Sequence, residues 1–586
     1  MHLQPIDWVL IVLYFAASIA MGLYYSRRAG KSTSEFFLSG RNLPWWLAGT
    51  SMVATTFAAD TPLAVTELVA TKGIAGNWLW WNMALGGMLT VFFFARLWRR
   101  AGVLTDVELI ELRYSGKPAA FLRGFRALYL GVFMNCIIMG WVNLALKSIL
   151  EGLFGIPSDA ALWYVVGCMV LVAFYSALSG LWGVAVTDAF QFVIAMFGTI
   201  ILAVVILNLP QVDGIAGLQA KLPPSTFNFL PEIGNEGLSV TTALALSVTA
   251  FLAYVAIQWW ASWYPGNEPG GGGYVAQRMM SAKDERHSLL ATLWFTVAHY
   301  CLRPWPWILT GLATLVLYPH LPEADKKLGY IYAMRDFLPA GLLGVLVAAF
   351  LAAYMSTIAT HLNWGTSYVV NDFYRRFIKN NASEKHYVYV SRAATAGMML
   401  VSLIVTANMQ TISGAWAFVI EAGAGLGLVL ILRWYWWRVN AWSEITAMVA
   451  PFLGYWFVKY HTQVEFPQSL FAIVGFTTIS WFVVTFLTRP THESTLIAFY
   501  RRTHPGGVFW KPIAEKVPEV RGDSGFVRLG LDWIAGVVLV YMTLFGTGKL
   551  LLGEYDSGFV FLAIAFAAGW TIYSDLSKRG WGTVGR

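Results

Sequence analysis

Long apolar runs separated by short polar segments repeat along the whole chain. A helix that crosses the hydrocarbon core of a bilayer needs ~20 mostly apolar residues. About fifteen runs reach that length, so the pattern predicts an all-α polytopic membrane protein with about fifteen spans. The spans are expected at 7–25, 44–70, 77–98, 122–152, 159–179, 183–209, 239–263, 288–317, 339–370, 387–408, 412–437, 441–460, 467–488, 529–551 and 558–576.

The composition agrees with a membrane protein. Apolar residues make up 57% of the 586 residues and charged residues 12%, whereas soluble domains are roughly 25% charged. Many of the 28 Trp and 26 Tyr lie near the ends of apolar runs, where they are expected to anchor helices at the membrane interfaces. The three cysteines all fall inside apolar runs, which argues against a disulfide framework.

Lys and Arg are concentrated in alternate loops, and this predicts the orientation of the chain. With the N-terminus outside, the inside segments hold about 31 of the 40 basic residues and the outside segments about eight. Residues 1–7 contain no Lys or Arg, and Arg27, Arg28 and Lys31 follow the first apolar run. We therefore expect an uncleaved first span and a cytoplasmic C-terminus. The net charge of +8 is then a topology signal and does not indicate nucleic-acid binding.

No stretch between the apolar runs is long enough for a soluble domain. The largest inside insertion, 489–528, predicts an interfacial helix and a linker. The phosphate-binding pattern GxxxxGK[ST] does not occur in the sequence. No metal cluster or nucleophile–base set stands out among the intramembrane polar residues. The sequence therefore favours gradient-driven transport over an enzyme and predicts no organic cofactor.

Two spans carry polar or helix-breaking residues at mid-membrane depth. The second begins at Pro44 and reads ATTFAADTP at 54–62; a proline there removes a backbone donor. The seventh ends in AIQWWASWYPGNEPGGGG. Irregular backbone at this depth is tolerated only where it lines a cavity. Each disrupted span opens a group of five, which is the pattern of two inverted repeats with a discontinuous first helix.

The ninth span carries an unusual set of polar side chains inside an apolar run. Ser356 and Thr357 are adjacent, and Thr360, His361 and Asn363 follow. Polar groups at mid-membrane depth are costly and usually functional. We interpret this helix as half of a cation site whose other half is the stretch 52–62 in the second span.

Four motifs resemble the sodium:solute symporter family, which has the LeuT-type fold: FFLSGRNLPWW (36–46), YSALSGLWGVAVTDAFQ (175–191), YVAQRMMSAK (274–283) and AAYMSTIATHLN (352–363). The resemblance covers spans 1 to 13 and implies a 5+5 inverted repeat with one extra N-terminal span and about four extra C-terminal spans. The implied divisions are 1–43 for the extra span and inner loop, 44–209 for the first repeat, 210–238 for an outer loop, 239–440 for the second repeat, 441–488 for two spans, 489–528 for the cytoplasmic segment and 529–586 for the last two spans and tail.

The resemblance implies a sodium site between the second and ninth spans. Its ligands would be the backbone carbonyls of Ala54, Phe57 and Ala353 and the hydroxyls of Ser356 and Thr357. Sodium is a hard cation that takes oxygen ligands, and unwound backbone supplies carbonyls that lack helical partners. The alternative is that both hydroxyls bond back to carbonyls one turn earlier in their own helix.

Asp188 matches an acid on the inner sodium path of the family, which in some members also helps to form a second sodium site. That second site needs a hydroxyl at the position of Ala353, which has none, so we expect one sodium per cycle. The alternative for Asp188 is an acid near a helix start that faces the helix dipole.

The solute is expected beside the sodium, near the broken helices. Asp60 would accept bonds from hydroxyls or an ammonium, and Trp faces stack on sugar rings or cations. As alternatives, most of the Trp would be packing or interface residues, Asp60 would pair with Arg303 or His299, and Arg303 would bind carbonyls freed by a proline kink. The candidate contacts are Thr55, Thr56, Asp60, Thr61, Trp80, Asn82, Gln258, Trp259, Trp260, Trp263 and His299.

One segment departs from the family pattern. The GNEPGGGG stretch before Gln277 and Arg278 is longer and richer in glycine than the family implies. We interpret it either as a mobile inner gate or as a flexible loop.

The prediction is a secondary active transporter of the plasma or inner membrane that couples sodium to the symport of a small organic solute by alternating access. A sugar or polyol is favoured over an amino acid such as proline. One rival is a proton-coupled transporter of the same fold, with Asp60, Asp188 or His361 as the proton relay. The other is a transport-inactive solute receptor. The oligomeric state stays open.

Overall fold

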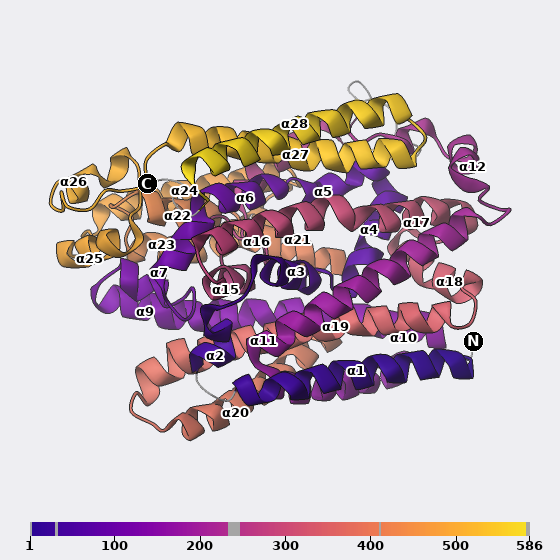
Figure 1. Ribbon diagram of the computed structural model, residues 1–586, viewed down its shortest axis with the longest axis horizontal. Coiled ribbons are helices and arrows are strands. Elements are labelled where there is room, and N and C mark those ends of the chain that lie inside the picture. Colours follow the sequence, from indigo (N-terminus) through magenta and orange to yellow (C-terminus); the bar gives the residue numbers. More distant parts are fainter. Residues whose placement is uncertain (1–2, 30–32, 232–246, 410–411, 582–586) are drawn as a thin grey trace.

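The computed structural model describes residues 3–29, 33–231, 247–409 and 412–581. Most of its helices run along the long axis of the molecule (Figure 1). Helix α1 (Pro5–Ala29) begins at one end of this axis and α28 (Tyr555–Arg579) ends towards the other, in the same figure. That arrangement fits a chain with an odd number of crossings.

Within the described residues, nine helices are long and apolar enough to cross a membrane. The count is lower than the fifteen spans expected, mainly because several spans are interrupted. The second span is broken into α3 (Trp45–Thr56) and α4 (Asp60–Lys72), as the sequence predicts. The eighth span bends at Pro304, where α16 (Glu285–Val297) and the π-helix η7 (Ala298–Leu302) give way to α17 (Pro304–Leu317).

The seventh span is also irregular, as expected. Its start at 239–246 lies outside the described residues. Helix α13 (Val248–Ala253), the π-helix η6 (Tyr254–Gln258) and α14 (Trp259–Ala261) end before an extended Ser262. Helix α15 (Gly273–Ser281) follows the glycine-rich stretch.

The expected link at 179–182 between the fifth and sixth spans is different. The backbone stays helical through it, and both spans form one helix, α11 (Ser158–Leu207). Its 50 residues would extend ~75 Å if straight, against a bilayer core of ~30 Å. The apolar lengths within it are Ser158–Ala173 and Leu181–Leu207, so the prediction of two apolar stretches is sound and the prediction of a loop between them is wrong.

The remaining elements are short helices and long apolar helices, several of which continue directly into one another. In the first half they are α2 (Thr33–Leu38), η1 (Ser39–Arg41), η2 (Ile74–Asn77), α5 (Trp78–Trp81), α6 (Ala84–Leu89), η3 (Thr90–Phe94), α7 (Ala95–Ala101), α8 (Leu109–Arg113), α9 (Gly116–Leu128), η4 (Tyr129–Met134), α10 (Asn135–Phe154), α12 (Gly214–Lys221) and η5 (Pro224–Phe227). In the second half they are η8 (Glu323–Asp325), α18 (Leu328–Phe337), α19 (Leu342–Ser367), η9 (Tyr368–Ile378), α20 (Glu384–Asn408), α21 (Ile412–Ala422), α22 (Leu426–Tyr435), α23 (Ala441–His461), α24 (Gln468–Leu487), α25 (Glu493–Thr503), η10 (Val508–Trp510), α26 (Lys511–Ala514) and α27 (Phe526–Leu551).

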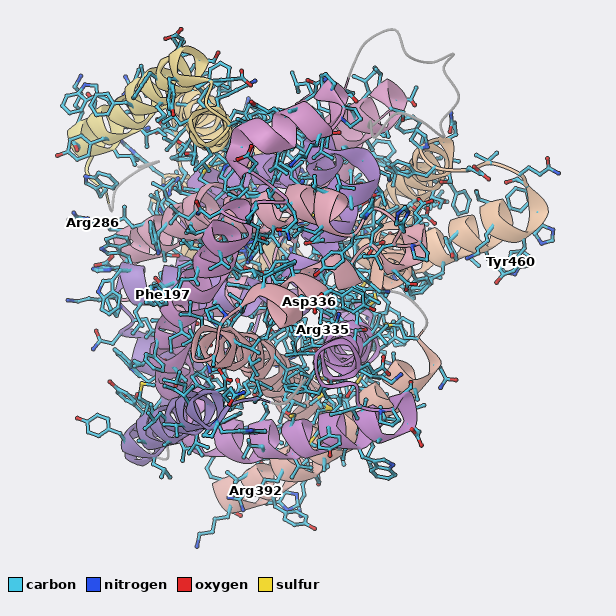
Figure 2. All side chains as sticks on the ribbon, turned by 90° about the vertical axis from the view of Figure 1, so that its right-hand side faces the viewer. Phe197, Arg286, Arg335, Asp336, Arg392 and Tyr460 are labelled. Carbon is cyan, nitrogen blue, oxygen red and sulfur yellow. The ribbon has the colours of Figure 1, made fainter. Side chains whose placement is uncertain are left out.

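Packing places the broken helices at the centre. Helix α11 packs along α19, α1 and α3, α3 packs on α16, and α4 packs on α17. The last two helices, α27 and α28, pair with each other along one edge, and α27 also contacts α6 and η7 (Figure 1). Side chains such as Phe197 and Tyr460 project from the rim of the bundle, whereas the pair Arg335–Asp336 lies on the face viewed in Figure 2. Apolar side chains on the rim fit a lipid environment.

The 489–528 insertion forms a folded cap at the end of the molecule where the chain terminates (Figure 1). Its α25 lies against α7 and α8, and α26 packs on α25 and η10. Arg113 of α8 stacks on the rings of Phe499 and Trp510 at 5.4 and 5.0 Å. Trp510 also donates to the carbonyl of Trp434 at 2.8 Å. The segment is thus docked on the bundle by aromatic and charged contacts.

Candidate functional site

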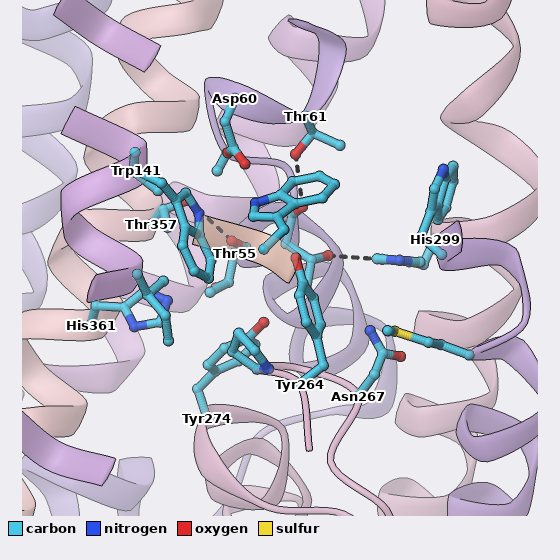
Figure 3. A pocket seen from close by; sticks show the side chains of 18 of the residues that line it. Thr55, Asp60, Thr61, Trp141, Tyr264, Asn267, Tyr274, His299, Thr357 and His361 are labelled. Atoms are coloured by element: carbon cyan, nitrogen blue, oxygen red, sulfur yellow. Dashed lines mark hydrogen bonds between the residues drawn. The ribbon is translucent and has the colours of Figure 1, made fainter. Parts of the chain in front are cut away.

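A cavity of ≈ 80 Å³ lies beside the break in the second span. One water needs ~10–15 Å³ on the same measure, so the cavity accommodates a small solute. Figure 3 shows Asp60 and Thr61 on one side of it, Tyr264, Asn267 and Tyr274 on the opposite side, and His299 and His361 flanking it. Its polar and aromatic lining is Thr55, Thr56, Asp60, Thr61, Trp80, Trp141, Tyr264, Asn267, Tyr274, His299, Arg303, Thr357, His361 and Trp416.

The break itself follows from the local sequence. Helix α3 ends at Thr56, and Phe57 leaves the helical region at φ −92°, ψ 75°. The N–H of Phe57 donates to the carbonyls of Ala54 and Val53, each at 3.0 Å. Helix α4 then starts at Asp60, with Pro62 in its first turn, where a missing N–H does no harm.

The two adjacent hydroxyls of α19 reach across to other helices. Thr357 donates to the carbonyl of Thr55 at 3.0 Å, next to the break. Ser356 donates to Asp188 of α11 at 2.5 Å. The alternative that these hydroxyls bond back within their own helix is therefore not what the structure shows. Both side chains are buried and hold α19 against α3 and α11.

Asp188 is the centre of a buried polar cluster. Its carboxylate accepts hydrogen bonds from Ser51 at 2.6 Å and from Ser356. Arg278 of α15 lies 3.7 Å away, and both side chains of this pair are 1% exposed. Asp188 lies well inside α11 rather than at a helix start, so the alternative of a dipole-facing terminal acid is wrong.

Arg303 forms hydrogen bonds with the C-terminal end of α3, next to the break. Its guanidinium donates to the Thr56 hydroxyl at 3.1 Å and to the Val53 carbonyl at 3.4 Å. It also donates to the carbonyl of His299, four residues earlier, at 3.2 Å. Arg303 thus binds the end of α3 and one carbonyl in the turn before Pro304. The Val53 carbonyl also accepts the N–H of Phe57, so it is not freed, and the interpretation that Arg303 binds carbonyls freed by the proline kink stays a prediction.

Asp60 is the acid of the cavity wall. It is 3% exposed and lies at the start of α4. Among the described residues it forms no ion pair, so the alternative of a pair with Arg303 or His299 is wrong. His299 instead contacts Thr56 at 3.0 Å. The charge of Arg303 reaches Asp60 only from beyond ion-pair distance, so the carboxylate is available to a bound ligand.

Residues 36–453 match the sodium:solute symporter family. The chain belongs to this family. It is a sodium-coupled solute symporter, a multi-pass membrane transporter and not an enzyme. The chain is 25% identical to a sodium/glucose cotransporter of Vibrio parahaemolyticus over 485 residues, which cover 78% of this chain and 86% of the relative. A sodium/mannose cotransporter of Bos taurus is 24% identical and covers 77% of this chain and 78% of its own.

The fold is shared with a solved sodium symporter. A substrate-bound, outward-open Na+-coupled sialic acid symporter superposes with a TM-score of 0.65 at 19% identity, covering 83% of this chain and 99% of that chain. A sodium/myo-inositol cotransporter 2 of Oryctolagus cuniculus is 24% identical over 495 residues, which cover 77% of this chain and 70% of the relative. The expected all-α fold of the LeuT type is confirmed.

Six of the solute candidates line the cavity of this symporter and five do not. Those in the lining are Thr55, Thr56, Asp60, Thr61, Trp80 and His299. Those outside it are Asn82, Gln258, Trp259, Trp260 and Trp263. All three Trp of the second group come from the seventh span, which contributes its Tyr264–Asn267 loop to the lining instead.

The five outlying side chains have structural contacts. Asn82 donates to the carbonyl of Trp78 at 2.8 Å, and Gln258 donates to that of Leu79 at 2.9 Å. Trp259 packs against Trp533 of α27, with ring centroids 5.8 Å apart and ring planes tilted by 35°. Because α14 ends at Ala261 and the chain turns at an extended Ser262, the helical Trp face neighbouring helices and not the cavity.

Several lining residues are absent from the sequence prediction of the solute site. Trp141 and Trp416 lie in ordinary apolar runs, and nothing in the sequence separates them from packing residues. Tyr264 and Asn267 belong to the YPGN stretch of the disrupted seventh span. The predicted break in this span could therefore have indicated that they line the cavity. His361, which the sequence suggested only as a proton relay, donates from Nδ1 to the amide oxygen of Asn135 at 2.6 Å.

The glycine-rich stretch is buried, which does not fit a flexible loop. Residues 268–273 are all buried. Trp98 of α7 donates to the carbonyl of Gly270 at 2.9 Å, and the N–H of Gly273 donates to Asp106 at 3.1 Å. The stretch is an internal part of the transporter core.

Proposed function

We propose that this symporter couples one sodium ion per cycle to the uptake of a hydroxylated solute such as a sugar or polyol. Two observations support this. The relatives named above are cotransporters of glucose, mannose and myo-inositol. The cavity combines the free carboxylate of Asp60 with the aromatic faces of Trp80, Trp141 and Trp416, which suits hydroxyls and sugar rings. An amino acid such as proline is the second candidate, because Asp60 also suits an ammonium.

We place the sodium between α3 and α19. Its proposed ligands are the carbonyls of Ala54, Phe57 and Ala353 and the hydroxyls of Ser356 and Thr357. The observation that carries this assignment is the bond from Thr357 to the Thr55 carbonyl, directly at the break and beside the solute cavity. An ion there would hold α3 and α19 together and complete the wall of the solute site.

We assign Asp188 to the exit path of the ion. It joins Ser356 to Ser51 and Arg278, so an ion that leaves Ser356 meets a carboxylate next. A sodium ion moving inward through 100 mV releases ~2.3 kcal/mol, to which its concentration gradient adds. That energy supports accumulation of solute without ATP. The transporter would lie in the plasma or inner membrane with its N-terminus outside.

The test is the thermal stability of the purified protein in sodium, compared with potassium or choline, with a panel of sugars, polyols, amino acids and carboxylates. A ligand that binds the folded state raises the melting temperature. We expect a sodium-specific rise and a further sodium-dependent rise with one class of solute. A solute effect that follows pH and ignores sodium would favour the proton-coupled alternative. Solute binding without uptake into proteoliposomes would favour a receptor.

The ion site is tested by Ser356→Ala combined with Thr357→Ala, which should remove the sodium dependence of solute uptake. Ser402→Ala is the matched control, since that buried hydroxyl bonds back to Met399 in its own helix. Unchanged sodium dependence in the double variant would refute the assignment.

A further inference from the structure

Glu268 is a buried acid that the proposed transport site does not use. It lies in the glycine-rich stretch of the seventh span and is 4% exposed. Neither carboxylate oxygen has a hydrogen-bond partner among the described residues. The backbone groups of Gly266 and of Glu268 itself lie near enough to favour the charged carboxylate, but neither is a side-chain cation. A carboxylate in this state is strongly destabilising unless something binds to it.

The charges around Glu268 do not neutralise it by contact. Arg126, the basic group whose field reaches Glu268, is committed to Glu444 at 3.0 Å. The other acid nearby, Asp106, accepts bonds from Tyr368 and from the N–H of Gly273. Asp106 therefore adds a second negative charge to the same region. The net negative charge of this region would favour binding of a positive ion beside Glu268.

A small cavity of ≈ 10 Å³ adjoins Glu268 and is large enough for a single ion or water. Thr90 and Thr292 line it from opposite helices, together with Asn267. Thr90 donates its hydroxyl proton to Gly86 and Thr292 donates its own to Ser288, both within their helices. The oxygen lone pairs of both hydroxyls remain available. Oδ1 of Asn267 accepts a bond from the Tyr300 hydroxyl at 2.9 Å and keeps a second lone pair.

Two glycines next to Glu268 leave the space that its carboxylate and the Trp98 contact occupy. Gly273 has φ +56°, and a Cβ on it would lie 2.6 Å from Oε1 of Glu268. Gly271 has φ +77°, and a Cβ there would lie 2.8 Å from Nε1 of Trp98. Any side chain at either position would displace Glu268 or the α7 contact. Gly273 of the GNEPGGGG stretch is thus required by the packing of Glu268, and Gly271 by that of Trp98.

We propose that Glu268 binds a sodium ion in this small cavity, with oxygens of Thr90, Thr292 and Asn267 as further ligands. Carboxylate, hydroxyl and amide oxygens suit a hard cation. Asn267 lines both this cavity and the solute cavity, so the ion lies directly behind the wall of the solute site. The site is separate from the one proposed at Ser356 and Thr357 and does not depend on it. Its ion would stay bound during the cycle, so the proposal of one transported sodium is unchanged.

The experiment titrates NaCl against choline chloride at constant ionic strength, with sodium as the only ligand, and follows the melting temperature of the full-length protein. Glu268→Gln keeps the shape and removes the charge. Without sodium, the variant should melt higher than the wild type, because the unpaired charge is gone. With sodium, it should gain less than the wild type, and it should bind one fewer ²²Na+ per chain.

Two variants make the result decisive. Thr292→Val keeps every charge and should weaken the Glu268-dependent sodium response several-fold. Ser356→Ala with Thr357→Ala should leave that response in place. Loss of sodium response in the double variant alone would support the proposed transport site and overturn the Glu268 site. Loss in Glu268→Gln alone would do the reverse. Equal melting temperatures and equal sodium titrations of wild type and Glu268→Gln would show a protonated or hydrated acid and overturn the proposal.

Discussion

Ser356 of α19 and Asp188 of α11 are joined by a hydrogen bond of 2.5 Å in the buried centre of the molecule. The same carboxylate holds Ser51 of α3 and lies 3.7 Å from Arg278 of α15. Four helices from both repeats therefore meet at one acid. If Ser356 binds an ion in place of Asp188, the contacts of all four helices with this acid would change.

The first prediction concerns the pair Asp188–Arg278. Asp188→Asn leaves a buried guanidinium without its counter-charge and should lower the free energy of unfolding by ~3–5 kcal/mol. Adding Arg278→Gln should restore part of that loss, because the lone charge disappears. A double-mutant cycle in sodium-free buffer measures the coupling. Strictly additive losses would show that the two groups do not interact.

Arg303 gives the second prediction. Its planar guanidinium reaches Thr56 and the Val53 carbonyl together, which the point charge of a lysine does not reproduce. Arg303→Lys should cost ~1.5–3 kcal/mol of unfolding free energy. Arg335→Lys on the outer face is the control and should cost under about 0.5 kcal/mol. Equal effects on the melting temperature would argue against a role at the break.

The breaks in the second and seventh spans were predictable, because an acid and a proline at 60–62 and a run of glycines at 270–273 are costly in a regular membrane helix. The cavity residues contributed by the second span follow from that break. What the sequence does not contain is the direction in which each side chain points. Trp259 and Trp260 occupy the last helical turn, whereas Tyr264 lies past it and lines the cavity.

Other features required the assembled structure. Trp141 and Trp416 have the same sequence context as packing tryptophans and reach the cavity only because α10 and α21 lie beside the break. The sequence predicted a loop between the fifth and sixth spans, but α11 is helical through this point. The short link contains no charge or proline, so nothing in the composition separates a loop from a continuous helix. Long-range pairs such as Ser51–Asp188 have no local signal.

The third prediction uses Glu111 of α8, outside the membrane spans. Burial alone would raise the pKa of its carboxyl, but hydrogen bonds from Arg376 and Arg123 outweigh this and hold the pKa below its usual 4.5. A lowered folded-state pKa means that the stabilisation is present above pH ~4.5 and is lost as the pH falls through the folded value. Glu111→Gln should therefore lower stability at pH 7 and flatten the acid limb of a melting curve. An unchanged acid limb would contradict this.

The fourth prediction concerns the docking of the 489–528 cap. Arg100 of α7 donates from one guanidinium nitrogen to both carboxylate oxygens of Asp523, at 2.8 and 2.9 Å. Asp523→Asn should speed tryptic cleavage within 489–528 several-fold, because this pair is largely buried. Glu519→Gln is the control, since its pair with Arg501 is 56% exposed on both sides and such pairs contribute little. Equal cleavage rates in the two variants would show that the cap is held by its aromatic contacts.

Asp60 offers the prediction that separates the two solute classes. An ionised carboxylate only accepts hydrogen bonds, and Asp60 lines the cavity without a contact ion pair among the described residues. Asp60→Asn keeps one acceptor oxygen and removes the charge. For a neutral sugar or polyol, a charged hydrogen bond becomes a neutral one, and the apparent affinity should fall about tenfold, or ~1.4 kcal/mol. For a solute with an ammonium group, the loss of the counter-charge should lower affinity by more than about a hundredfold. Asp213→Asn, at an exposed position before α12, is the control and should leave the solute-dependent melting shift unchanged. An Asp60→Asn variant with wild-type solute affinity would remove Asp60 from the solute site.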